Sequence, residues 1–197
     1  MMTLTEQKID ELIKQIKKYV QKNVSKSRYE HSLRTAEMCS KLCSLYKLDE
    51  NLGYLMGISH DMCKNVDADT MLELTKLDGE PVSEIEMEKP GLLHGRAAAV
   101  LLERDFDFHD QRIIEAVANH TFGKVSMGDY AKVLFVADKV EPGREHITSD
   151  YLKELFKLSI NRACEKVLQE NIDFLNKKGR KIAPESIRLL NWLKSLD

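Results

Sequence analysis

The chain has 197 residues, of which 43% are hydrophobic and 31% charged, with a net charge of −2 at pH 7. This length fits one domain with a buried core, and the charge excludes the basic surface by which proteins hold nucleic acid. No apolar run approaches the roughly 20 residues of a membrane span, and the N-terminus lacks the continuous apolar block of an export signal. Four cysteines without a second closely spaced pair indicate reduced, buried thiols. We therefore expect a cytoplasmic protein that binds neither nucleic acid nor membranes.

The first helix is predicted from an amphipathic N-terminal segment. Its apolar stripe follows i, i+3, i+4, i+7 spacing: Ile9, Leu12, Ile13, Ile16 and Val20. Thr3 and Glu6 have the spacing of a capping box at its start. The stripe can pack within the chain or across a homodimer.

The next two helices begin at recognisable caps. Ser27 and Glu30 repeat the capping-box spacing, which places His31 just past the first turn of the second helix. Asp49 can cap a third helix over residues 52–58, which runs directly into a histidine–aspartate pair.

The rest of the chain also follows the helical period. Residues 78–91 contain two prolines and no period, and predict a loop after a short helix at 70–77. Further helices are expected at 92–103, 110–120, 129–141, 151–177 and 184–196. Gly179 suits a helix C-terminus and Pro184 a first turn. The prediction is a single all-α domain over 1–197, with its functional core at about 25–145 and helices 150–197 completing a pocket.

Four histidines and two aspartates stand near predicted helix ends. The candidate ligands are His31, His60, Asp61, His94, His120 and Asp138. Imidazole and carboxylate together suit iron, manganese, cobalt, nickel or zinc. Six ligands exceed what one tetrahedral ion needs, so the count favours two ions. Two ions sharing a carboxylate are typical of enzymes that attack phosphorus, which predicts a metal-dependent phosphohydrolase.

Ordinary roles compete with metal binding at several of these residue types. His109 and His146 lie in polar stretches and are expected to be surface residues. Asp138 interrupts an apolar run, where an unpaired carboxylate is costly to bury. It is either a metal ligand or a helix-terminal carboxylate paired with Lys139 or Arg144.

The order His31, His60-Asp61, Asp138 resembles the H…HD…D signature of the HD-domain phosphohydrolase superfamily. His94 in LLHG and His120 in NHTFG resemble the subset that holds two metals. More narrowly, the segments RYEHSLR, HDMCK, LLHG, HTFG, ADKVEPGR and KGRKIAPESIRLLNWL are similar to the YqeK family. That family comprises symmetrical diadenosine tetraphosphate hydrolases with a di-iron centre, and the resemblance extends from Arg28 onward.

The resemblance implies a helical HD-domain fold with a binuclear metal site in the helix core. His31, His60, Asp61 and Asp138 would hold one iron, and His94, His120 and the second oxygen of Asp61 the other; manganese or cobalt could substitute. A hydroxide bridging the metals would attack an inner phosphorus and release two ADP. Asp61 and Lys64 would then be the catalytic residues.

Helical spacing also predicts phosphate-binding cations. Lys64 follows Asp61 by three residues and Arg28 precedes His31 by three, which places each beside a ligand. Further substrate contacts are expected from loops, at Thr121, Gly123, Lys124, Arg144 and, against the nucleoside, Ile182. The alternative for the cations is a solvated charged face.

Two other functions stay open. A helical HD module could bind a nucleotide as a sensor without turnover, although all six ligands are present. The same superfamily also offers hydrolysis of a nucleoside mono- or triphosphate.

Overall fold

The computed structural model describes residues 6–196, and every regular element within this range is a helix. The elements are α1 (Glu6–Asn23), α2 (Lys26–Leu45), α3 (Glu50–Ser59), α4 (Ala68–Thr75), η1 (Lys76–Asp78), α5 (Glu84–Glu88), η2 (Pro90–Leu93), α6 (His94–Phe106), α7 (Gln111–Asn119), α8 (Asp129–Val140), α9 (Ser149–Leu155), α10 (Ile160–Lys177) and α11 (Pro184–Lys194). The all-α prediction is confirmed. None of the helices in the described part of the chain is long and apolar enough to cross a membrane.

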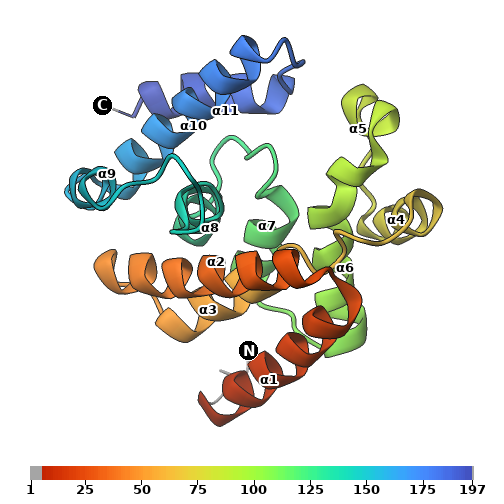
Figure 1. Ribbon diagram of the computed structural model, residues 1–197. Coiled ribbons are helices and arrows are strands. Elements are labelled where there is room, and N and C mark those ends of the chain that lie inside the picture. The colour runs from red at the N-terminus through yellow and green to blue at the C-terminus, as the bar shows by residue number, and fades with distance from the viewer. Residues whose placement is uncertain (1–5, 197) are drawn as a thin grey trace.

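Helix α8 lies at the centre of the molecule (Figure 1). It packs against α2, α3 and α7 on one side and against α10 on the other. A helix enclosed in this way is apolar around most of its circumference, and nearly all of its side chains are buried, from Tyr130 to Val140. This packing explains the apolar run in which Asp138 stands.

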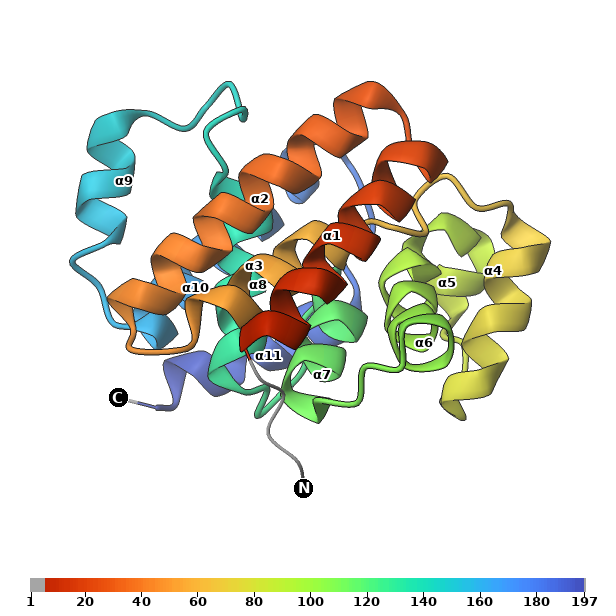
Figure 2. The same cartoon turned by 90° about the horizontal axis from the view of Figure 1, so that it is seen from below.

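Helix α1 covers α3 and the start of α2, as the view from below shows (Figure 2). Ile9, Ile16 and Val20 are buried within the chain, so the predicted apolar stripe packs in cis. The predicted capping box cannot be compared because Thr3 lies outside the described residues.

The predicted cap of α3 is confirmed, and that of α2 is wrong by two residues. The Asp49 carboxylate accepts from the N–H groups of Asn51 and Leu52 at 2.8 and 3.0 Å. At α2 the cap is Ser25, which has extended backbone angles and accepts from Arg28 N. Ser27 also matches the cap pattern, but the chain already turns helical at residue 26.

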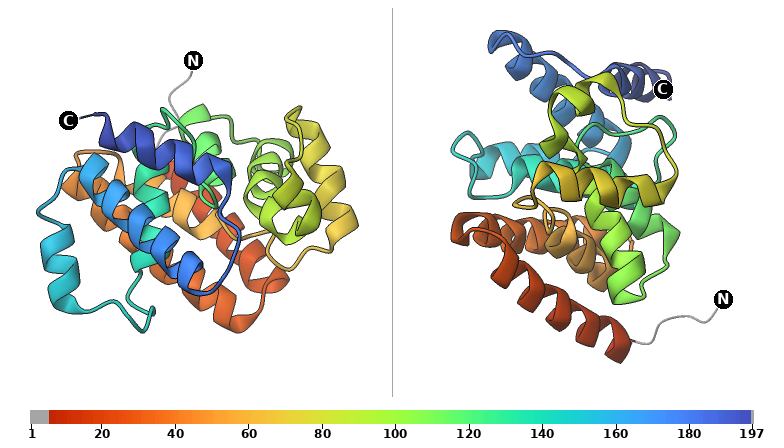
Figure 3. Two further views of the ribbon diagram at one scale, coloured as in Figure 1. Left: turned by 90° about the horizontal axis from the view of Figure 1, so that it is seen from above. Right: turned by 90° about the vertical axis from the view of Figure 1, so that its right-hand side faces the viewer.

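The predicted loop at residues 78–91 contains two short helical elements, α5 and η2. Ser83 and Glu86 form a capping box that starts α5, a single turn too short to show hydrophobic periodicity. Arg96 of α6 fastens the segment by donating to the Asp78 carboxylate and to the carbonyls of Glu80 and Pro81. Helices α4, α5 and α6 thereby form one side of the molecule (Figure 3).

The predicted long helix at 151–177 is two helices, α9 and α10. Ser159 starts α10 by accepting from Arg162 N, and the break also lets Leu158 O accept from the Tyr46 hydroxyl at 3.2 Å. The end of α10 follows the prediction, with Gly179 at φ +62° and Arg180 N donating to Leu175 O. Pro184 occupies the first turn of α11 as expected.

Candidate metal centre

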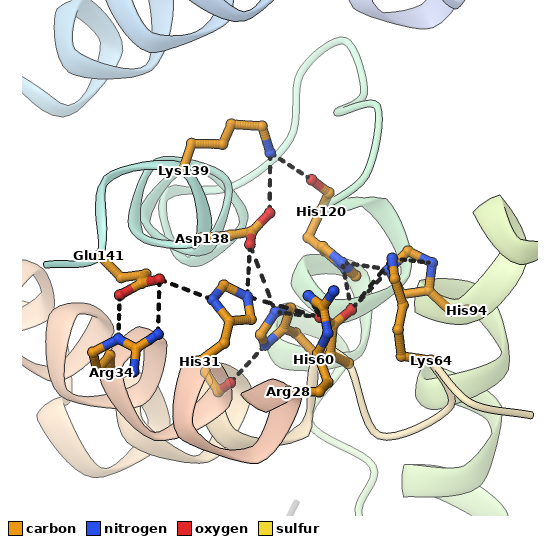
Figure 4. Close-up of polar contacts among 12 residues, drawn as sticks. Arg28, His31, Arg34, His60, Lys64, His94, His120, Asp138, Lys139 and Glu141 are labelled. Atoms are coloured by element: carbon orange, nitrogen blue, oxygen red, sulfur yellow. Dashed lines mark hydrogen bonds and ion pairs between the residues drawn. The ribbon is translucent and has the colours of Figure 1, made fainter. Parts of the chain in front are cut away.

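The six predicted ligands lie together although they come from distant parts of the chain, and five of them are labelled in Figure 4. His31 lies in the second turn of α2 and Asp138 in the last turn of α8. The other ligands stand at helix ends: His60 is the C-cap of α3 and is followed by Asp61, His94 begins α6, and His120 is the C-cap of α7. All but Asp138 are buried as residues.

Two glycines allow the ligand-bearing helices to approach one another. A side chain at Gly57, one turn before His60, would collide with the backbone of α2 at Ala36, whose N would lie 2.8 Å from the new Cβ. A side chain at Gly95 would stand 2.8 Å from Val117 O and 2.9 Å from the His120 ring. Real Cβ atoms do not tolerate such distances, so the ligand geometry depends on glycine at both positions.

Asp61 lies between two histidine pairs and turns one oxygen toward each. Its Oδ2 is 3.8 Å from His31 Nε2 and 3.4 Å from His60 Nε2. Its Oδ1 is 3.0 Å from His94 Nε2 and 3.9 Å from His120 Nε2. One carboxylate therefore serves both groups.

Asp138 joins only the first of these groups. Its Oδ1 is 3.1 Å from His31 Nε2 and 3.7 Å from His60 Nε2. In the second group the Nε2 atoms of His94 and His120 are 3.0 Å apart. The ligand atoms of His31, His60 and Asp61 lie within 4.8 Å of one another, as do those of Asp61, His94 and His120.

The histidine rings are held in the tautomer that a metal site needs. The Nδ1–H of three rings donates to the carbonyl three residues earlier: His60 to Gly57, His94 to Gly91 and His120 to Val117, at 2.7–2.8 Å. His31 donates instead to the carboxylate of Glu141 at 3.1 Å. Such bonds orient the ring and leave the Nε2 lone pair free for a ligand.

A cation accounts for buried atoms that are otherwise unpaired. The Nε2 atoms of His31 and His60 are buried and meet no hydrogen-bond partner in suitable geometry. Orphaned polar atoms of this kind are costly in a protein interior. Two groups of imidazole and carboxylate ligands, sharing Asp61, fit two divalent transition-metal ions.

Burial and neighbouring charges shift the pKa values of four of the ligands. Burial would raise the pKa of Asp61, but the neighbouring His60 and His94 hold it well below its usual range. Burial acts likewise on Asp138, whose pKa is held low by Lys139, His31 and His60. The two carboxylates raise the pKa of His60 despite its burial, whereas burial and the nearby His94 and His60 push the pKa of His120 well down. These shifts keep both carboxylates ionised and the His120 ring neutral, which are the forms of these side chains that bind a metal ion.

Partly exposed cations border the centre. Lys64 Nζ lies 3.1 Å from His94 Nε2 and 3.7 Å from Asp61 Oδ1, and burial lowers the pKa of Lys64. Arg28 donates to Asp61 Oδ2 at 2.6 Å. Arg144 lies 3.0 Å and Lys139 3.4 Å from the Asp138 carboxylate, so the ion pairs that were the alternative to metal binding are present, and the ligand histidines lie beside the same carboxylate.

The predicted loop contacts lie farther out. Thr121 follows His120 directly, and its hydroxyl is buried without a partner. The N–H of Gly123 donates to Asn119 O at 2.8 Å. Lys124 is exposed, and Ile182 is half-buried in the loop before α11. Beside it, Lys181 pairs with Glu88 of α5 at 2.6 Å, which joins the α10–α11 loop to the other side of the molecule.

Sequence reasoning missed Glu141 and Arg34. Glu141 is 2% exposed and accepts from His31, from Arg34 at 2.6 Å and from Gly143 N at 2.6 Å. Although burial would raise the pKa of Glu141, these donors lower it. One signal was available, since Glu141 follows Asp138 by three residues and so lies on the same helix face. His109 and His146 are exposed and take no part in the centre.

An all-helical fold that gathers histidine and aspartate side chains in two groups around one shared carboxylate defines a helical domain that could hold metal ions. The chain belongs to the HD domain family, whose model matches residues 28–143. This range contains all six candidate ligands and ends just beyond Glu141.

Similar proteins cover nearly the whole chain. The symmetrical bis(5'-nucleosyl)-tetraphosphatase of Staphylococcus aureus is 27% identical over 94% of this chain and 96% of its own. The protein of the same name in Bacillus subtilis is 26% identical over 89% and 94%. A crystal structure from Clostridium acetobutylicum, described as a predicted HD superfamily hydrolase involved in NAD metabolism, has a TM-score of 0.85 at 27% identity, covering 93% of this chain and 97% of its own.

Proposed function

We propose that this protein is a metal-dependent hydrolase that cleaves diadenosine tetraphosphate symmetrically into two ADP. The observation that carries the proposal is the placement of the Asp61 carboxylate. One of its oxygens faces His31 and His60, and the other faces His94 and His120. The two symmetrical tetraphosphatases match this chain over almost their full lengths, which supports the substrate.

The six ligands would hold two divalent ions, with iron favoured and manganese or cobalt as substitutes. Such ions lower the pKa of a coordinated water and polarise phosphoryl oxygens. The first would be held by His31, His60, Asp61 and Asp138, and the second by Asp61, His94 and His120. Four free, buried cysteines fit the reducing cytoplasm in which ferrous iron persists.

The reaction adds one water across the central phosphate bridge. The water oxygen forms a bond to an inner phosphorus, the P–O bond to the bridging oxygen breaks, and each product keeps two phosphates. Negative charge accumulates on the phosphoryl oxygens during this step. Lys64, Arg28 and Arg144 stand beside the ligands with side chains 32%, 33% and 37% exposed, so they can meet these oxygens from the solvent side.

The ion pairs of these cations would change when the metal ions and then the substrate bind. In the structure Arg28 and Arg144 neutralise Asp61 and Asp138. Metal ions would take over that neutralisation and release the guanidinium groups for the polyphosphate. Thr121, with its unpaired hydroxyl, and Lys124 are further candidates for phosphate contacts, and Ile182 for the nucleoside.

A panel of nucleotides tests the substrate class. Protein reconstituted with Mn²⁺ or Fe²⁺ is incubated with diadenosine tetraphosphate, nucleoside mono- and triphosphates and NAD. We expect diadenosine tetraphosphate to have the highest kcat/KM. The description of the Clostridium protein makes a nucleotide of NAD metabolism the second candidate, which preferential turnover of NAD or a related nucleotide would favour. Tight nucleotide binding without any hydrolysis would instead indicate a sensor.

A further inference from the structure

His31 differs from the other three histidines of the centre in what holds its ring. The other rings donate to backbone carbonyls of their own helix or turn. His31 donates to Glu141, a residue 110 positions away at the C-cap of α8. An ionised carboxylate is a stronger hydrogen-bond acceptor than a carbonyl. When it accepts from one ring nitrogen of a histidine, the other nitrogen becomes a more basic metal ligand.

Glu141 is itself held in place by donors on both of its oxygens. Arg34 Nε and Gly143 N donate to Oε2, each at 2.6 Å. Oε1 accepts from His31, with Arg34 Nη2 at 3.4 Å and Arg144 Nε at 3.7 Å. A side chain at Gly143 would collide with the Arg34 guanidinium, so glycine there leaves room for this arrangement. Figure 4 shows Glu141 between Arg34 and His31.

The two cation groups also differ in the number of ligands. The first has two histidines and two carboxylates, His31, His60, Asp61 and Asp138, and the second has two histidines and the shared carboxylate. The charge of the surrounding side chains does not decide which group binds its cation more tightly, because positive side chains border both. Lys64 stands by the second group and Arg28 and Arg144 stand by the first. Lys139 contacts both, through the Asp138 carboxylate and the His120 carbonyl.

We propose that Glu141 is a positioning residue that, through His31, makes the His31–His60–Asp61–Asp138 group the tighter of the two cation sites. The inference rests on the proposed function for the presence of two ions. Glu141 links α2 to the end of α8, which carries Asp138, so one carboxylate orients ligands from both helices. The two ions would then load in order, and the ion held by His94 and His120 would exchange more readily.

The substitution Glu141→Gln isolates this role. It preserves size, but an amide has one oxygen and one NH2 group, whereas every neighbour of Glu141 is a donor. The NH2 group must therefore face either His31 Nδ1–H or the Arg34 and Gly143 donors. Removing such a partner of a metal-bound histidine lowers metal affinity by about 10- to 100-fold.

The experiment titrates metal-free protein with Co²⁺, following the visible absorption of the bound ion and competition with a chelator. Wild type is expected to bind two Co²⁺ in two steps. In Glu141→Gln the tighter step should weaken by about 10- to 100-fold and shift its spectrum, while the weaker step stays within about twofold. Glu145→Gln, the same change at an exposed residue four positions on, should leave both steps unchanged.

Two results would overturn the inference: both steps unchanged in folded Glu141→Gln, or an equal loss in both. If that variant does not fold, Arg34→Gln, at a side chain 36% exposed, must show a smaller loss in the tighter step alone. A wild type that binds one Co²⁺ contradicts the two-ion proposal, but Glu141→Gln must still lower the affinity for that ion. A wild type that binds none contradicts both.

Discussion

Asp61 is the residue on which the proposed centre depends most, because among the carboxylates of residues 6–196 it is the one that faces both histidine pairs. Asp61→Ala removes a ligand from each group, so we predict background turnover and the loss of at least one bound ion per chain. His109→Ala, at an exposed histidine paired with Asp107, is the control and should change neither quantity. Elemental analysis and a rate assay on the same preparation check the prediction. Two ions retained in Asp61→Ala would contradict the assigned role.

Substitutions of Lys64 test how the negative charge on the phosphoryl oxygens is stabilised during the reaction. Its ammonium lies 3.7 Å from Asp61 and is only partly exposed, so it can approach a phosphoryl oxygen next to the ligands. We predict that Lys64→Ala lowers kcat by about 10²- to 10³-fold, as removal of one preorganised donor does elsewhere. Lys64→Arg should recover part of the loss, because it keeps the charge but not the compact shape. An unchanged kcat in Lys64→Ala would place Lys64 on the solvated surface instead.

At the residue scale the sequence identified which side chains gather, but not how they are held. The six candidate ligands were recognisable because histidine and aspartate at helix ends, in one order, form an unusual pattern. Glu141 and Arg34 were not, because their contact joins positions 107 residues apart and acidic and basic residues are common throughout the chain. Hydrogen bonds of this kind depend on where two helices cross, which periodicity does not specify.

At the element scale the centre depends on how closely the helices pack. Gly57→Ala places a methyl group against the α2 backbone at Ala36, between the helix of His31 and that of His60. Overpacking costs about 1–3 kcal/mol, and here it also moves the two ligands apart. We therefore predict a lower Tm together with weaker metal binding.

Gly91→Ala provides the matched control for Gly57→Ala. It stands three residues before His94, as Gly57 stands three before His60, but nothing lies within 4 Å of an added Cβ. Thermal unfolding and metal content should both stay at wild-type values. Equal effects of the two substitutions would show that close packing at Gly57 does not set the ligand geometry.

The long helices could be predicted and the short ones could not. Helices such as α1 and α11 have enough turns to show an apolar period or flanking proline and glycine signals. The five residues of α5 have no such period, and only the Ser83–Glu86 capping box marks them. The break between α9 and α10 was missed because apolar residues continue through it, while the deciding signal is one capping residue, Ser159.

At the scale of the whole molecule, the centre joins elements from α2 to α8 and so couples metal binding to stability. Ligands that bind only the folded state stabilise it by about 2.7 kcal/mol at 100 times their dissociation constant. For a chain of this size that corresponds to about 5–10 °C in Tm for each ion. We predict that chelation lowers Tm by this amount and that added Mn²⁺ or Fe²⁺ restores it. A Tm that does not respond to chelator or metal would contradict a cation at the junction of these helices.

The identity of the products tests the proposed function most directly. Metal-loaded protein is incubated with diadenosine tetraphosphate and the nucleotides are separated by anion-exchange chromatography, with Asp61→Ala under the same conditions as the control. Attack at an inner phosphorus, with cleavage of the central bridge, predicts ADP as the sole product, two per substrate consumed, and no product from the variant. AMP and ATP in equal amounts would show asymmetric cleavage and contradict the proposal.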